Sequence, residues 1–102
     1  MSDKPAVALS DAEWAIVQKI LQTYLPGCSV WAFGSRTTGR HHRFSDLDIA
    51  IIGGPALSFS AVAALREAFD ESDLPWKVDI VDWHDIGDDF RRIIDAHKVR
   101  LQ

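Results

Sequence analysis

The sequence lacks most features of secreted and membrane-spanning proteins. Its 102 residues include one cysteine, Cys28, so no internal disulfide can form, which is typical of a reducing compartment. No apolar run approaches the roughly 20 residues that a membrane-spanning helix needs. The first residues also lack the pattern of a signal peptide. We therefore expect a cytoplasmic protein without membrane association.

Basic residues are also few. The chain has 11 lysines and arginines against 15 aspartates and glutamates, which gives a formal net charge of −4. General nucleic-acid binding relies on many cationic contacts to phosphate, so this balance disfavours it. A hydrophobic content of 47% and a charged content of 25% are ordinary for a globular protein. We predict a single domain over residues 10–102, preceded by a flexible leader over residues 1–9.

The stretch from Trp31 to Ile52 contains the most informative motif. A β-branched and aromatic segment ends at Gly34-Ser35, and a nearly continuous apolar segment begins at Leu47. This pattern predicts a strand, a glycine turn, a polar loop and a buried strand. A glycine turn exposes backbone N–H groups that suit an anion, and the hydroxyl of Ser35 adds a donor. Gly34 and Ser35 are therefore candidate phosphate-binding residues.

Two aspartates mark the start of the second strand. Asp46 and Asp48 are two residues apart, so their side chains lie on the same face of a strand. Neighbouring carboxylates repel each other, and a hard cation such as Mg²⁺, shared with substrate phosphates, resolves the conflict. Asp79 lies in a later β-branched segment and completes a triad if the two strands are adjacent. We predict Asp46, Asp48 and Asp79 as catalytic and metal-binding residues.

The remaining segments predict the elements around this motif. Ser10 and Glu13 match a capping box, and Pro26-Gly27 ends the helix that follows. The expected elements are a helix over residues 10–25, strands over 29–33 and 46–52, a helix capped by Ser58 or Ser60, a strand over 76–83, a helix from about residue 86 and a short strand over 99–101. This order fits an α+β, two-layer fold with a small mixed sheet, helices on one face and the other face open for substrate.

Gly34-Ser35, ten further residues, Asp46-Leu47-Asp48 and Asp79 on a later strand closely resemble the nucleotidyltransferase superfamily with the DNA polymerase beta type of palm. The Gly-Ser-Arg-x-x-Gly turn and the Ser-Asp-Leu-Asp-Ile run resemble its minimal nucleotidyltransferases, and the likeness extends from about residue 10 to residue 101. The resemblance implies the palm fold, two Mg²⁺ ions and ATP as substrate. It also implies an antitoxin that transfers AMP to a tyrosine of a cognate HEPN-domain ribonuclease toxin.

The residues leave several assignments open. Arg36 adjoins the Gly-Ser turn and is a candidate phosphate contact, whereas Arg40 fits a solvated loop cation equally well. His41 and His42 lack a matching ligand cluster, and His97 is expected on a helix face rather than in catalysis. No residue identifies a base pocket, so ATP rests on the resemblance. Two other functions compete: a binding module that silences its partner by masking it, and a subunit that modifies a small molecule such as an aminoglycoside.

Overall fold

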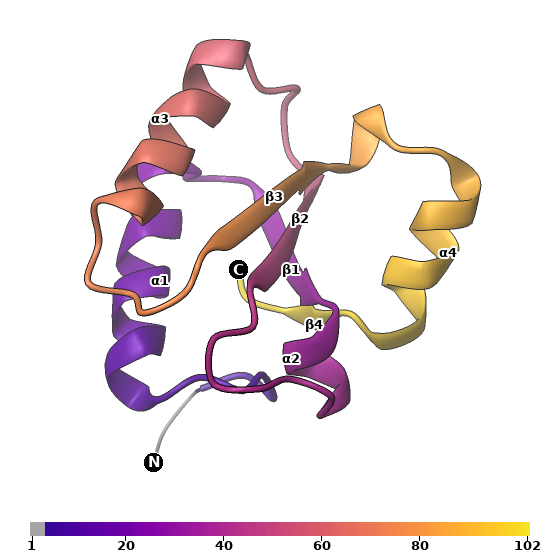
Figure 1. The fold of residues 1–102 in the computed structure, drawn as a ribbon. Helices are drawn as coiled ribbons and strands as arrows, with labels where there is room; N and C mark the ends of the chain where they lie inside the picture. The colour runs from indigo at the N-terminus through magenta and orange to yellow at the C-terminus, as the bar shows by residue number, and fades with distance from the viewer. Residues whose placement is uncertain (1–3) are drawn as a thin grey trace.

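A computed structural model describes residues 4–102 of the chain (Figure 1). The elements are α1 (Asp11–Tyr24), β1 (Ser29–Phe33), α2 (Ser35–Thr38), β2 (Leu47–Gly53), α3 (Phe59–Asp70), β3 (Val78–Asp82), the 3₁₀ helix η1 (Trp83–Asp85), α4 (Asp88–His97) and β4 (Val99–Arg100). The predicted order is confirmed, including the short final strand. None of the helices in this part of the chain is long and apolar enough to cross a membrane.

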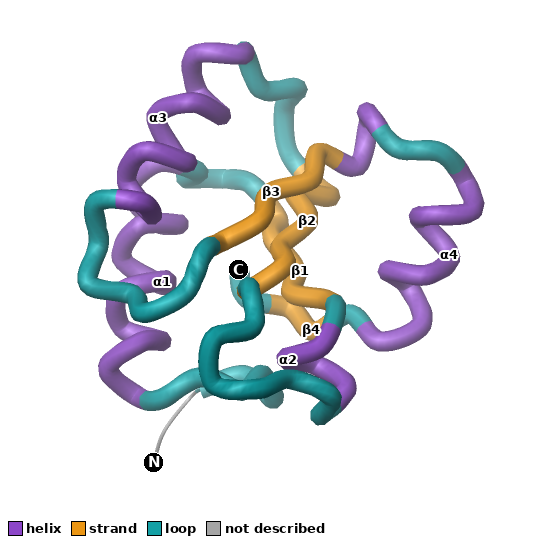
Figure 2. The backbone as a smooth tube through the Cα atoms, in the orientation of Figure 1, coloured by secondary structure: helices purple, strands orange, loops and turns teal. Residues whose placement is uncertain are grey.

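The four strands form one mixed sheet in the order β3-β2-β1-β4 (Figure 2). β1 is antiparallel to both β2 and β4, whereas β2 and β3 are parallel. The expected adjacency of β2 and β3 is confirmed, and their register pairs Asp48 with Asp79. On the other side of β2, Phe33 pairs with Asp48, so the end of β1 also lies beside this carboxylate.

Local signals in the sequence explain where the two long helices begin. The Ser10 hydroxyl accepts a hydrogen bond from the Glu13 N–H at 3.1 Å, and the Ser10 N–H donates to the Glu13 carboxylate at 2.8 Å, which completes the predicted capping box. Of the two candidates for the second helix, Ser58 is the cap, and its hydroxyl accepts from the Ala61 N–H at 3.1 Å. Each helix therefore starts where a side chain satisfies an otherwise unpaired backbone donor.

α1 and α3 cover one face of the sheet, and the main core lies between them and the strands (Figure 1). The buried side chains of this layer include Val17 and Leu21 from α1 and Leu65 and Phe69 from α3. They pack with alternate residues of the strands, among them Val30, Ala32, Leu47, Ile49 and Ile51. Because side chains alternate along a strand, the residues between these, including Asp48, lie on the opposite face.

α4 lies on that opposite face, so the expectation of helices on one face alone holds for α1 and α3 but not for α4 (Figure 1). Ile94 of α4 is fully buried and packs with Phe33 and Ala50. Phe90 meets the Phe33 ring edge to face, with 5.9 Å between ring centroids. α4 thus partly covers the face that the sequence predicts to be open. Asp48 lies on the same face, next to Phe33.

The prediction of a flexible leader is wrong for residues 4–9. Val7 and Leu9 are both buried and belong to the main core. The Ala8 N–H donates to the backbone carbonyl of Arg36 at 2.9 Å, which connects this segment to α2. The apolar residues gain by leaving water, so the segment packs although it has no regular secondary structure. Residues 1–3 of the predicted leader lie outside the described residues.

Candidate active site

Gly34 connects β1 to α2 at the centre of the candidate site. Its φ of 80° lies in the left-handed region that favours glycine. A Cβ atom added here would lie 2.2 Å from a carboxylate oxygen of Asp48, far inside van der Waals contact. Glycine is therefore needed at this position both for its backbone conformation and for the close approach of the chain to the carboxylate.

Three aspartates gather beside this turn. Asp48 and Asp79 occupy paired positions on parallel strands and share a face of the sheet, while Asp46 precedes β2. Asp48 is partly buried, and its pKa is raised to about 6 by burial first and by the negative charges of Asp79 and Asp46 second. The structure thus brings the three predicted carboxylates close enough to influence one another, with Asp48 in the least solvated position.

The chemistry of these donors fits a hard divalent cation. None of the three carboxylates forms a hydrogen bond or ion pair with another of the residues 4–102. No three His, Cys, Asp or Glu side chains in the described chain form a group that could hold a metal ion by themselves. Magnesium is commonly bound by one or two carboxylates together with water and substrate phosphates. The arrangement therefore suits a metal site that the substrate completes, and the ligand set stays a prediction.

Arg36 has a different position from the one that the sequence suggested. Its side chain is buried, with 6% of the residue exposed, and its guanidinium lies over the Trp76 ring at 4.5 Å. The guanidinium donates to the backbone carbonyls of Ala8 at 2.7 Å, Ser45 at 2.9 Å and Arg43 at 3.1 Å. These bonds use all three of its nitrogens, so Arg36 fixes the loop between α2 and β2 rather than facing a phosphate.

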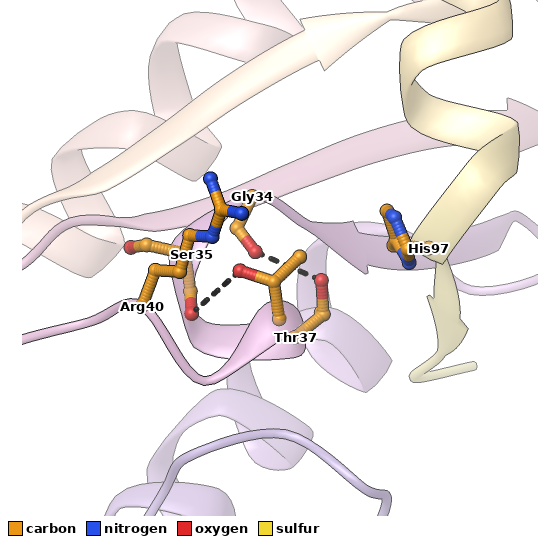
Figure 3. A pocket seen from close by; sticks show the side chains of 6 residues that line it. Gly34, Ser35, Thr37, Arg40 and His97 are labelled. Carbon is orange, nitrogen blue, oxygen red and sulfur yellow. Dashed lines mark hydrogen bonds between the residues drawn. The ribbon is translucent and has the colours of Figure 1, made fainter.

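A cavity of about 630 Å³ lies beside the glycine turn (Figure 3). It is lined by Gly34, Ser35, Thr37, Thr38, Arg40 and His97. The hydroxyl of Thr37 donates to the carbonyl of Gly34 at 2.9 Å, and that of Thr38 donates to the carbonyl of Ser35 at 3.4 Å. Gly34 and Ser35, two of the three predicted phosphate-binding residues, therefore line the cavity, and Arg36 does not. The hydrogen bonds of the two threonines stabilise the turn.

Sequence reasoning missed part of this lining. Thr37 and Thr38 occupy the two variable positions of the Gly-Ser-Arg-x-x-Gly turn, and the motif assigns no function to those positions. His97 is the last residue of α4, and no local sequence pattern indicates that it lies near the Gly34 turn. Its position results from the pairing of β4 with β1, which places the end of α4 beside Gly34.

The fold and the site together define a nucleotidyltransferase of the polymerase beta type. The family model described as "Polymerase beta, Nucleotidyltransferase" matches residues 16–101, and the chain belongs to this family. Over 94 residues it is 52% identical to the probable protein adenylyltransferase MntA of Haemophilus influenzae. The matched region covers 92% of this chain and 82% of that protein. The likeness extends across nearly the whole domain, so the chain is a homologue of MntA.

Solved structures give the same result. A toxin–antitoxin crystal structure with AMP-PNP matches with a TM-score of 0.72 and 27% identity, covering 87% of this chain and 72% of that one. A mutant of the MntA–HpeT toxin–antitoxin matches with a TM-score of 0.71 and 25% identity, covering 92% of this chain and 72% of that one. These matches confirm the predicted palm fold and its small mixed sheet.

Replacing Gly34 should separate two costs. Gly34→Ala suffers both a backbone conformation that is essentially restricted to glycine, with φ 80° and ψ −157°, and the collision with Asp48. Gly39→Ala has the milder left-handed conformation, with φ 81° and ψ 5°, and no atom within 4 Å of the new Cβ. We expect Gly39→Ala to lower the free energy of unfolding by about 1 kcal/mol and Gly34→Ala by about 3 kcal/mol. Urea denaturation of both variants, and of Gly34→Ala combined with Asp48→Ala, measures the difference. Equal costs at the two glycines would contradict the close approach.

Asp48 should make stability depend on pH. Because the fold raises its pKa from 3.8 to about 6, the native state holds the proton more tightly and ionisation destabilises it. The wild type should therefore lose stability relative to Asp48→Asn as the pH rises from about 4 to about 6, and the gap should stay constant above that range. At pH 7 the Asn variant should be more stable by about 1 to 2 kcal/mol, a value reduced for solvent screening. A difference in unfolding free energy between the two proteins that does not change across this pH range would contradict the raised pKa of Asp48.

Proposed function

We propose that this protein is an antitoxin that transfers AMP from ATP to a tyrosine of a cognate HEPN-domain toxin. The observation that carries the proposal is the pairing of Asp48 with Asp79 directly beside the Gly34 turn, on a nucleotidyltransferase fold. The relative that is 52% identical is named a probable protein adenylyltransferase, which supports a protein as the acceptor. The solved toxin–antitoxin with AMP-PNP, an analogue of ATP, supports the nucleotide.

The reaction requires in-line displacement at the α-phosphorus. A bond forms between the tyrosine oxygen and the α-phosphorus, the bond to the bridging oxygen breaks, and pyrophosphate leaves. Gly34 and Ser35 bind the β- and γ-phosphates through backbone N–H groups and the serine hydroxyl. Asp79 is exposed at the edge of the sheet, where its carboxylate can accept the proton of the incoming hydroxyl.

We assign the metal site to Asp46, Asp48 and Asp79, with two Mg²⁺ ions. When bound, the ions offset the negative charge on the phosphates during transfer. The carboxylates would hold the cations beside β2 and β3, the strands on which Asp48 and Asp79 lie. A bound cation would offset the burial and the neighbouring negative charges that together raise the pKa of Asp48, and would therefore favour its ionised form.

The acceptor comes from a partner in this proposal. Asp79 lies on β3, the edge strand of the sheet, so a second protein has access to the carboxylate from the side. The two solved toxin–antitoxin structures described above support a toxin as that partner. We infer a cytoplasmic location for the pair, which the buried free thiol of Cys28 supports because free thiols are typical of a reducing compartment.

The direct test is the intact mass of the cognate HEPN protein, which we expect to be encoded beside this chain, after incubation with the chain, Mg²⁺ and ATP. We expect a gain of one or more AMP units with the wild type and no gain with Asp46→Ala/Asp48→Ala. Asp73→Ala is the matched control, because Asp73 is an exposed aspartate outside the site and should transfer AMP as the wild type does.

The same experiment identifies the alternatives. If the Asp46→Ala/Asp48→Ala variant neutralises the toxin without any gain in mass, the protein acts by masking the toxin and not by catalysis. Absence of modification by the wild type, in a complex that forms normally, would show that the acceptor is not the toxin. Modification by the double variant would contradict the assignment of the carboxylates.

A further inference from the structure

Two exposed side chains with N–H donors line the cavity beside Gly34. Arg40 follows the glycine that ends α2, and His97 is the last residue of α4. Both are exposed, and neither forms a hydrogen bond or ion pair within residues 4–102. In the view of Figure 3, Arg40 lies next to Gly34 and Ser35, and His97 lies on the far side of Thr37. The cavity thus has free donors at two sides and the glycine turn between them.

The sheet places His97 and the carboxylates on opposite sides of the glycine turn. Asp48 pairs with Phe33 from the β2 side, and Asp79 lies one strand further out. Val99 pairs with Ala32 from the β4 side, and His97 is two residues before it. A ligand that spans the turn therefore has one end at the carboxylates and the other at His97.

This order matches the charge distribution along a nucleoside triphosphate. In the proposed reaction the α-phosphate lies at the carboxylates and the following phosphates lie over Gly34 and Ser35. The cavity beside Gly34 and Ser35 is also lined by Arg40 and His97, so both side chains border the position of these terminal phosphates. Arg36 cannot serve this end, because its guanidinium is buried against backbone carbonyls.

We propose that His97 binds the terminal phosphates of the nucleoside triphosphate and makes the site prefer a triphosphate to a monophosphate. The inference rests on the proposed function. An imidazole N–H donates a hydrogen bond to a phosphate oxygen in either protonation state. Arg40 supplies the opposite wall of the same subsite. His97 therefore acts on substrate affinity and on the leaving pyrophosphate, not on the acceptor.

The test measures binding without turnover. Isothermal titration with Mg²⁺ and α,β-methylene-ATP, and separately with AMP, compares the wild type, His97→Ala and His97→Gln. His41→Ala is the matched control, because His41 is an exposed histidine of the loop after α2 that does not line the cavity. Thermal unfolding of each variant checks the fold.

We expect His97→Ala to weaken the triphosphate analogue by about tenfold, the usual effect of losing one charge-assisted hydrogen bond. AMP affinity should stay within about twofold, His97→Gln should lose less because it keeps an N–H donor, and His41→Ala should match the wild type. Unchanged triphosphate affinity, or an equal loss for AMP and triphosphate, would overturn the role of His97 while leaving the proposed function intact. A wild type that binds neither nucleotide would overturn both.

Discussion

The close approach of the Gly34 backbone to the Asp48 carboxylate constrains the rest of the site. The distance of 2.2 Å from an added Cβ to the Asp48 oxygen leaves room for hydrogen alone at this position. The pairing of Phe33 with Asp48 sets that approach, and the parallel pairing of β2 with β3 adds Asp79 on the same face. Phosphate donors and carboxylates are thereby brought together by strand register rather than by mobile loops.

The structure holds this arrangement from both sides. The buried Arg36 guanidinium donates to three backbone carbonyls, and these bonds connect the segment before α1 to the loop between α2 and β2. On the other side, Ile94 of α4 packs on Phe33 at the end of β1. Charged residues thus have two separate uses here: the guanidinium stabilises the loop, whereas the carboxylates keep unpaired charge that a cation can neutralise.

Residues close together in sequence were predictable from local patterns, whereas the one long-range contact predicted, the adjacency of β2 and β3, rested on the family resemblance. The spacing of Gly34, Asp46 and Asp48 follows from strand periodicity, and the structure gathers them with Asp79 as expected. The caps at Ser10 and Ser58 are also local signals.

Tertiary contacts account for the rest. An arginine beside a glycine turn has the same local pattern whether it binds phosphate or backbone, so the inward position of Arg36 depends on Ala8 and Trp76. The placement of α4 and His97 depends on how β4 pairs with β1, which no window of sequence contains.

The measurement that tests the account most directly is the carboxyl ¹³C titration of Asp48 by NMR, with and without Mg²⁺ and α,β-methylene-ATP. We predict a pKa of about 6 in the free protein and a fall when both are added. A pKa near 3.8 that does not respond to them would contradict the account.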